Sequence, residues 1–230
     1  LPVVFQHGLC GDAGQTAEAF PEDPRFRLLT LECRGHGRSD AGDPAAFSLA
    51  AFAGDVAGFI ESRRLGPAVI GGISMGAALA LRLAVRRPDL VRGLVLARPA
   101  WLTEAAPENM APYAEGGGLL QRLPADEARA AFVLSETARR LASEAPDNLS
   151  SLLGFFDRKP QHVTAALLCS IAADGPGVAA DELRALQVPT CVVGHGRDNA
   201  HPLAHAEALA GLVAGARLVR ITPKAEDRVR

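Results

Sequence analysis

AVIGGISMGAALALRLAV, residues 68–85, is the stretch that decides how this chain folds. The apolar run at residues 68–70 predicts a strand, and the Ala- and Leu-rich residues after Ser74 have the composition of a helix. A serine on so sharp a turn has strained backbone geometry that pushes its hydroxyl outward, while flanking glycines let neighbouring backbone pass without a Cβ clash. Residues 72–76, GISMG, therefore predict a nucleophilic serine; the alternative is a structural serine in a glycine-rich turn.

Length, composition and charge limit the classes of protein. The chain has 230 residues, 48% of them hydrophobic, which is enough for one α/β domain with a sizeable core. Its net charge of −2 comes from interspersed acids and arginines, so we expect no nucleic-acid partner, no membrane partner and a small, neutral molecule as substrate. No apolar run is long enough to span a bilayer, and no leader segment is evident. The oligomeric state is left open.

The cysteine spacing bears on the cellular compartment. Cys10, Cys33, Cys169 and Cys191 lie far apart, without C-x-x-C spacing, in apolar or glycine-rich surroundings. We expect them to be reduced and mostly buried, in a cytoplasmic protein that needs no metal and no cofactor.

Strand and helix signals alternate along the chain. A βαβ series with short crossovers predicts an α/β fold with a doubly wound, mostly parallel sheet. The expected strands are residues 2–5, 27–31, 68–70, 94–97, 188–193 and 217–221, and the expected helices are residues 15–20, 48–64, the segment after Ser74, and 202–214. Leu1 leads straight into a strand and few residues follow the last one, so we expect elements to be missing at both ends.

Between the fourth and fifth expected strands the sequence changes character. Prolines, a GGG break at residues 116–118 and amphipathic stretches at residues 125–144 and 148–156 replace the strand signal. We therefore expect residues 103–183 to form a helical insertion in a core made of residues 1–102 and 184–230.

The order of the motifs resembles the α/β-hydrolase superfamily. His7-Gly8 follows a strand, residues 34–39 read RGHGRS, the GISMG turn comes next, and Gly196-Arg197-Asp198 follows a late strand. The resemblance covers nearly the whole chain except the insertion, which in this family is a helical cap over the active site. It implies a serine hydrolase whose oxyanion hole uses the backbone N–H of Leu9.

Ser74, Met75 and Asp198 also have a chemical rationale apart from the resemblance. Negative charge develops on the carbonyl oxygen when a serine attacks an acyl carbon, and Met75 N–H at the helix N-terminus is placed to stabilise it. Asp198 lies just past a strand, at the edge where open α/β sheets place their sites, and we expect it to orient a histidine. Its alternative role is a helix N-cap or turn residue. We expect Trp101 and the insertion to line the substrate pocket.

The expected catalytic histidine is missing from its usual place. The family has it just after the last strand, where this chain reads TPKAEDRVR, residues 222–230. Candidate replacements are Lys224, Glu226, Asp227 and His201; a desolvated lysine is a better base than a carboxylate of ordinary pKa. The histidines His195, His201 and His205 surround Asp198, and we expect mainly surface or loop roles for them.

Three functions remain open at this point. One is lyase, dehalogenase or peroxidase-like chemistry on the same scaffold, of which a dehalogenase is disfavoured because its nucleophile would be an aspartate; the other two are as follows. The first is hydrolysis of a small ester, lactone or related acyl compound by Ser74, with Leu9 and Met75 as oxyanion hole and Asp198 as acid. The second is a member of the same fold that has lost its triad and binds a small ligand or a protein partner without catalysis. The intact turn favours the first, and the missing histidine favours the second.

Overall fold

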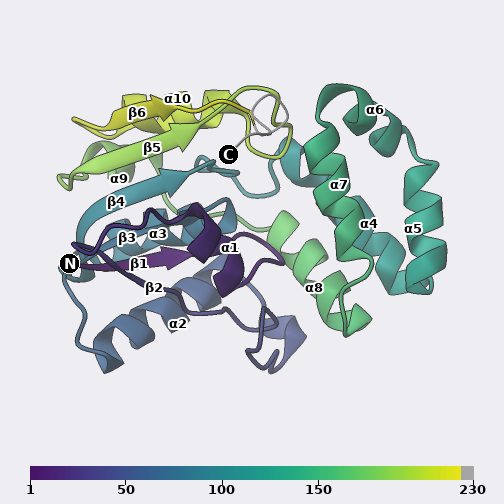
Figure 1. Ribbon diagram of the computed structural model, residues 1–230, viewed down its shortest axis with the longest axis horizontal. Coiled ribbons are helices and arrows are strands. Elements are labelled where there is room, and N and C mark those ends of the chain that lie inside the picture. The colour runs from purple at the N-terminus through teal and green to yellow at the C-terminus, as the bar shows by residue number, and fades with distance from the viewer. Residues whose placement is uncertain (224–230) are drawn as a thin grey trace.

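The fold is a single parallel sheet with helices on both faces and a helical segment beyond one end (Figure 1). The computed structural model describes residues 1–223. Six strands lie in the order β2-β1-β3-β4-β5-β6, and every neighbouring pair is parallel. The strands are β1 (Pro2–Gln6), β2 (Arg27–Leu29), β3 (Ala68–Ile73), β4 (Val91–Ala97), β5 (Thr190–Gly194) and β6 (Arg217–Arg220). The predicted fold class is confirmed.

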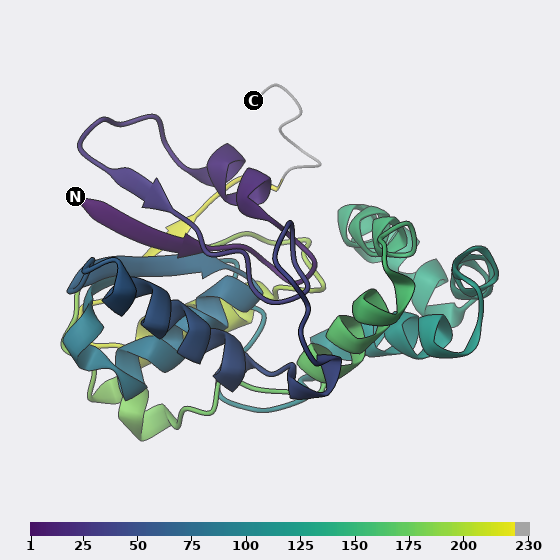
Figure 2. The same ribbon diagram turned by 90° about the horizontal axis from the view of Figure 1, so that it is seen from below.

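Helices cover the sheet on both sides. Four helices connect the strands of the sheet: α1 (Ala13–Ala19), α2 (Leu49–Ser62), α3 (Met75–Arg86) and α10 (Leu203–Leu212). Figure 2 shows α2 and α3 together on one face and α1 on the other. The start of α2 is the predicted one, since the Ser48 hydroxyl accepts a hydrogen bond from Ala51 N–H at 3.0 Å.

The strand order reverses beside β1. The chain moves outward from β1 to β2, then returns to β3 on the other side of β1 and continues outward to β6. Open α/β sheets bind ligands at the carboxyl ends of the strands where the order reverses in this way. The loop after β1 and the turn after β3 meet there, so this edge is where a site is expected.

Close backbone approach explains the glycines around the turn after β3. A Cβ on Gly72 would lie 2.6 Å from the carbonyl oxygen of Gln6, and a Cβ on Gly76 would lie 2.3 Å from the same atom. Neither distance is compatible with a side chain, so β1 and the start of α3 pack this tightly only because both positions are glycine. The glycines therefore fix the position of Ser74 against β1.

Every element assigned between β4 and β5 is helical. These are α4 (Ala111–Arg122), α5 (Ala125–Val133), α6 (Glu136–Glu144), α7 (Pro146–Phe155), α8 (Gln161–Ala172) and α9 (Ala180–Arg184), with a short 3-10 turn at Glu108–Met110 before α4. Two further 3-10 turns lie outside this segment, at Pro44–Ala46 before α2 and at Pro88–Leu90 before β4. Figure 1 shows α4 to α8 gathered beyond the end of the sheet, whereas α9 lies beside the strands. The expected boundary after residue 183 thus falls inside α9, where Arg86 of α3 pairs with Glu182.

One predicted helix is divided into two. The amphipathic stretch at residues 125–144 breaks after Val133, and Ser135 caps the start of α6 by accepting a hydrogen bond from Ala138 N–H at 3.1 Å. A serine that bonds the backbone locally favours a helix start over a helix interior, which is the physical reason for the break.

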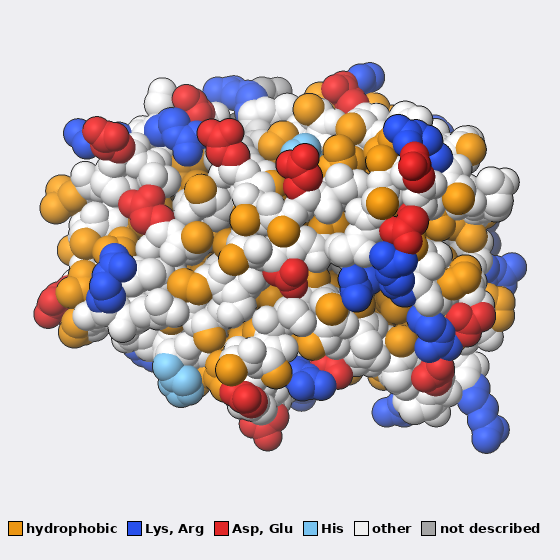
Figure 3. Space-filling model, turned by 180° about the vertical axis from the view of Figure 1, so that it is seen from behind, with side chains coloured by type: hydrophobic (Ala, Val, Ile, Leu, Met, Phe, Trp, Pro, Cys, Tyr) orange, Lys and Arg blue, Asp and Glu red, His pale blue; other side chains and the backbone are white. Residues whose placement is uncertain are grey.

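The surface carries both signs of charge. Figure 3 shows basic and acidic side chains interspersed on the face seen from behind, as the net charge of −2 suggests. Among residues 1–223, no helix combines the length and the apolar character that crossing a membrane requires.

Candidate active site

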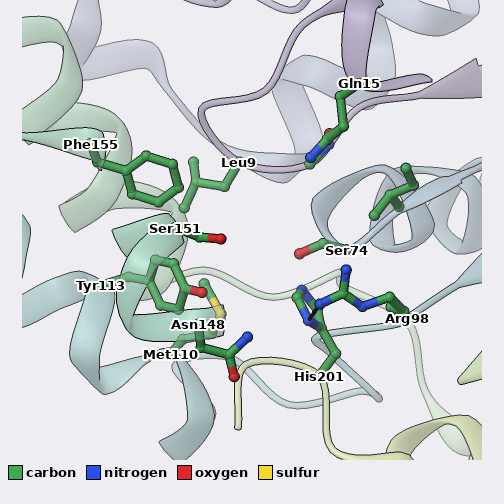
Figure 4. A pocket seen from close by; sticks show the side chains of 12 residues that line it. Leu9, Gln15, Ser74, Arg98, Met110, Tyr113, Asn148, Ser151, Phe155 and His201 are labelled. Atoms are coloured by element: carbon green, nitrogen blue, oxygen red, sulfur yellow. Dashed lines mark hydrogen bonds between the residues drawn. The ribbon is translucent and has the colours of Figure 1, made fainter. Parts of the chain in front are cut away.

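Ser74 has the strained geometry that the sequence predicts for a nucleophile. It is the N-cap of α3, with φ 57° and ψ −109°, and its N–H donates to the carbonyl of Ala97 at 3.0 Å. A non-glycine residue in this region costs on the order of 1–3 kcal/mol, which the packing around the turn must offset. Its hydroxyl faces a cavity (Figure 4).

The loop after β1 lies directly against Ser74. His7 is fully buried and braces the loop: its Nε2 accepts from Cys33 N–H at 3.0 Å, and Nδ1 donates to the carbonyl of Gly8 at 2.8 Å. Burial lowers the pKa of His7, so the ring stays neutral and suits this bracing role. A Cβ on Gly8 would be 3.4 Å from Ser74 Cβ, which places Leu9 next to the serine.

The N–H groups of Leu9 and Met75 are available for an acyl oxygen. Within residues 1–223, neither group donates a hydrogen bond, whereas Gly8 N–H donates to Oε1 of Gln15 at 2.7 Å. Met75 is the first residue of α3, where helical N–H groups have no partner inside the helix. A hole for a developing oxyanion needs backbone donors without other acceptors, and both N–H groups meet this condition within the described residues.

An arginine from the helical segment holds the same loop. Arg158 follows α7; its Nη1 donates to the carbonyl of Cys10, and its Nη2 donates to the carbonyl of Gly35 at 3.2 Å. Cys10 has φ 60°, a strained conformation for a residue with a side chain. The first hydrogen bond attaches the helical segment to the residue that follows Leu9, and the second attaches it to the loop after β2.

Asp198 is a buried acid with a full set of partners. It follows β5, and its side chain is 1% exposed. Oδ2 accepts from Nε and Nη2 of Arg98 at 2.9 and 2.6 Å, and Oδ1 accepts from Nδ2 of Asn148 at 3.0 Å. Burial alone raises its pKa, but the hydrogen bond from His201 and the charges of His201 and Arg98 outweigh burial and hold the pKa below its ordinary value. Asp198 is therefore ionised at neutral pH.

His201 lies between this acid and the cavity. Its Nδ1 is 3.0 Å from both carboxylate oxygens of Asp198, and its backbone N–H donates to Oδ1 at 3.1 Å. Its Nδ1 is also 3.2 Å from Nη2 of Arg98. Donation from Nδ1–H to the carboxylate is the charge-assisted choice and leaves a lone pair on Nε2. Burial lowers the pKa of His201, and Asp198 opposes that effect.

His201 lies in the loop before α10, as expected for a loop residue, but its side chain is not on the surface. Its side chain is 11% exposed and lines the cavity that Ser74 also lines. The reason is local: α10 begins only at Leu203, so the chain after Asp198 turns back and places His201 on the carboxylate. His195 is also buried, with Nε2 3.5 Å from Asp198 Oδ2, and His205 is half-buried.

The cavity opens to solvent, and the space in and above it, open solvent included, is about 540 Å³. Its walls come from the loop after β1, the ends of β3 and β4, α1, α4, α7 and the loop before α10. The lining residues are Gly8, Leu9, Gln15, Ile73, Ser74, Arg98, Met110, Tyr113, Asn148, Ser151, Phe155 and His201. Figure 4 shows the Ser74 and Ser151 hydroxyls facing each other across it, with His201 and Arg98 beside Ser74.

Trp101 does not line this cavity, contrary to the expectation. It is fully buried, and its indole N–H donates to the carbonyl of Asp174 at 2.8 Å. An indole ring can be fully buried at low cost when its one N–H has a hydrogen-bond acceptor, and the carbonyl of Asp174, after the end of α8, is that acceptor. Trp101 therefore joins the segment to the core.

Three candidate bases fall outside the described residues. Lys224, Glu226 and Asp227 lie in residues 224–230, so His201 is the one candidate base whose position is described. Within residues 1–223, no group of three or more His, Cys, Asp or Glu side chains could hold a metal ion.

Sequence reasoning missed Arg98, Asn148, Gln15 and Arg158. Arg98 had a signal, because it follows the strand at residues 94–97, and the rule that located Asp198 at the carboxyl edge applies to it equally. Asn148 and Arg158 lie in the insertion, where helical periodicity indicates buried faces but not which core loop a polar side chain reaches.

Comparison with known proteins finds matches among the alpha/beta hydrolases. The family model for the alpha/beta hydrolase fold matches residues 2–225. The sn-1-specific diacylglycerol lipase ABHD11 of Mus musculus is 31% identical over 145 residues, which are 62% of this chain and 44% of the mouse protein. The 2-(acetamidomethylene)succinate hydrolase of Mesorhizobium japonicum is 34% identical over 129 residues, covering 55% of this chain and 46% of that protein. The chain thus spans less than half the length of these relatives.

Solved structures agree on the architecture. A thermophilic esterase from Thermogutta terrifontis superposes with a TM-score of 0.73 at 25% identity, covering 96% of this chain and 80% of the esterase. The enol-lactonase from Burkholderia xenovorans LB400 superposes with a TM-score of 0.67 at 24% identity, covering 99% of this chain and 85% of the lactonase. The lactonase comparison shows the fold alone.

Proposed function

The chain belongs to the alpha/beta hydrolase fold family, and from that premise we propose that it is a serine hydrolase of small esters, lactones or related acyl compounds. The observation that carries the proposal is the cavity shared by Ser74 and His201, with His201 hydrogen-bonded to Asp198 behind it. The hydrolase relatives support hydrolysis in general, and the site supports the acyl class.

The first half of the reaction forms an acyl-enzyme. Ser74 Oγ attacks the acyl carbon while Nε2 of His201 takes the hydroxyl proton. Because the proton leaves during the attack, no free serine alkoxide has to form beforehand. Asp198 keeps Nδ1 protonated and stabilises the imidazolium that forms. The C–O bond to the leaving alcohol then breaks as His201 returns the proton to the departing oxygen.

The second half releases the acid. Water enters, His201 Nε2 takes one of its protons, and the resulting oxygen nucleophile attacks the acyl carbon on Ser74. His201 then protonates Ser74 Oγ as the ester bond breaks. The products are a carboxylic acid and an alcohol, and the enzyme returns to its starting state.

Backbone donors lower the barrier of both halves. The N–H groups of Leu9 and Met75 stabilise the negative charge on the carbonyl oxygen in each tetrahedral intermediate. Each such donor contributes roughly 3 kcal/mol to the transition state. Their lack of other partners in residues 1–223 supports this role.

In this proposal the helices α4 to α8 act as the cap. Met110, Tyr113, Ser151 and Phe155 come from this segment or its approach and line the cavity opposite Ser74, so they select the substrate. The thiols of all the cysteines are free, which supports a reducing, cytoplasmic setting.

A fluorophosphonate probe tests the nucleophile. Labelling of the unaltered chain that disappears in Ser74→Ala, together with hydrolysis of 4-nitrophenyl acetate, is the expected result. Ser151→Ala is the matched control, because its hydroxyl faces the same cavity, and it should keep the label. Absence of labelling in the unaltered chain would instead favour a non-catalytic protein that binds a small ligand.

A further inference from the structure

Arg98 is placed beside Ser74 by the sheet itself. Arg98 follows β4, and Ser74 follows the neighbouring strand β3, whose last residue Ile73 pairs with Ala97. Arg98 has φ 47°, so its backbone is strained in the same way as that of Ser74. The guanidinium and the serine hydroxyl therefore lie next to each other at one edge of the cavity (Figure 4).

The hydrogen bonds of Arg98 leave one end of the guanidinium without a partner. Nε and Nη2 both donate to Oδ2 of Asp198, and Nη2 also lies 3.2 Å from His201 Nδ1. No hydrogen bond from Nη1 occurs within the described part of the chain. A guanidinium offers donors in a fixed plane, so two N–H groups remain for a molecule in the cavity.

Within residues 1–223, the lining of this cavity carries no negative charge to match that of Arg98. None of the described lining residues is an aspartate or a glutamate, and the lowered pKa of His201 leaves that ring neutral at neutral pH. Glu18, Asp147 and Asp198 line an adjoining hollow that Arg98 also borders. Asp198 does balance the charge of Arg98, but its side chain is 1% exposed whereas that of Arg98 is 34% exposed. A molecule in the cavity therefore meets the cation and not the carboxylate behind it.

We infer that Arg98 binds a carboxylate of the substrate, so that the enzyme selects short acyl compounds with a carboxylate close to the reacting carbonyl. The inference rests on the proposed function and narrows it. Because Arg98 adjoins Ser74, the carboxylate and the acyl carbon must belong to one short chain, as in half-esters of small dicarboxylic acids. The small net charge of the sequence, with acids and arginines interspersed, had favoured a neutral substrate, but the positive charge of Arg98 inside the cavity favours an anionic one.

A matched pair of esters tests this selection. Mono-4-nitrophenyl succinate and 4-nitrophenyl butyrate share the leaving group and differ mainly in a terminal carboxylate. The unaltered enzyme should have a kcat/KM for the succinate about 10-fold or more above that for the butyrate, as expected for one charge-assisted hydrogen bond. A ratio near or below one would overturn the inference.

Substitutions at Arg98 assign the effect to this side chain. Arg98→Met should bring the ratio of the two kcat/KM values to about one or below, and Arg98→Lys should keep part of it, because the ammonium retains the charge. Arg129→Met, an exposed arginine on α5, should leave the ratio unchanged. The ratio is the measured quantity because Arg98 also holds Asp198, so both rates are expected to fall. An unchanged ratio in Arg98→Met would contradict the inference.

Binding separates this inference from the proposed function. In Ser74→Ala, monomethyl succinate should bind more tightly than methyl butyrate by calorimetry, and Arg98→Met in that background should remove the difference. Equal binding of the two esters would overturn the role of Arg98 even if Ser74 proves to be the nucleophile. Full hydrolysis by Ser74→Ala would overturn the proposed function, whereas Arg98-dependent binding would stand without it.

Discussion

Asn148 of α7 donates a hydrogen bond from Nδ2 to Oδ1 of Asp198 at 3.0 Å, which joins the helical segment to the buried acid. Oδ1 of the same Asn148 side chain accepts hydrogen bonds from the backbone N–H groups of Asn199 and Ala200 at 2.7 and 3.2 Å. One side chain thus fixes both the carboxylate and the backbone that leads to His201.

We expect Asn148→Ala to lower kcat about 10-fold and to destabilise the fold by about 1–3 kcal/mol, because one buried and one half-buried N–H group lose their acceptor. Activity assays and denaturant unfolding measure the two effects. Ser150→Ala on the exposed side of α7 is the control and should change neither. A stable, fully active Asn148→Ala would contradict the role given to this amide.

His201→Gln should lower kcat by about 10³-fold or more, because Ser74 then lacks a base. Glutamine keeps a polar group of similar size, so the change mainly removes proton transfer. His162→Gln, an exposed histidine on α8, should have ordinary activity. If His201→Gln retains most of its activity, the base is another residue, and Lys224 and Glu226 would be replaced next.

The pH dependence of kcat/KM should have an acid limb with its midpoint below 6.5. Burial lowers the pKa of His201 from its ordinary value of 6.5, and the base works only when unprotonated. Activity should therefore be fully present at neutral pH and be lost as the pH falls through the lowered pKa. A midpoint above 6.5 would argue against His201 as the base.

Stability should fall on acidification because of buried histidines. Burial lowers the pKa of His36 to about 3, so between this value and 6.5 the unfolded chain binds a proton that the folded chain does not. Stability therefore rises with pH in that window, and at pH 5.5 His36 alone costs on the order of 1 kcal/mol relative to pH 7.5. Denaturant unfolding at both pH values should show this loss, and His36→Gln should show less of it.

Arg158→Met should reduce kcat about 10-fold or more with a smaller effect on KM, since a loosened loop impairs the transition state more than substrate binding. Arg158→Lys should restore part of the activity. Arg129→Met again serves as the exposed control. Equal loss of stability and activity, with no recovery in the lysine variant, would point to a purely structural role.

The sheet and the turn that holds Ser74 could be predicted from the sequence because local sequence patterns indicate both. Apolar runs mark the strands, and the glycines on either side of Ser74 form a recognisable local pattern. The contact that requires these glycines, with the carbonyl of Gln6, is distant in sequence and was not predicted. The helical division after Val133 was missed because capping by Ser135 competes with the amphipathic period.

The acid's surroundings depend on contacts distant in sequence. Asn148 reaches Asp198 across 50 positions, and Arg98 reaches it across 100. No periodicity encodes such pairs. The burial of His201 beside the acid was not predicted for a different reason: the short loop before α10 turns it back toward the acid, and loop direction cannot be derived from residue types alone.

In the part of the chain that the structure describes, the hydrogen bonds of Arg158 to the core go to backbone carbonyls, those of Cys10 and Gly35. A carbonyl is present whatever the residue, so the contact does not depend on the side chain at position 10. Position 35 is more restricted, because Gly35 has φ 71° and a Cβ there would lie 2.9 Å from Val163. The wall of the cavity near Leu9 can therefore change its side chains during evolution while the attachment between the two parts of the protein persists.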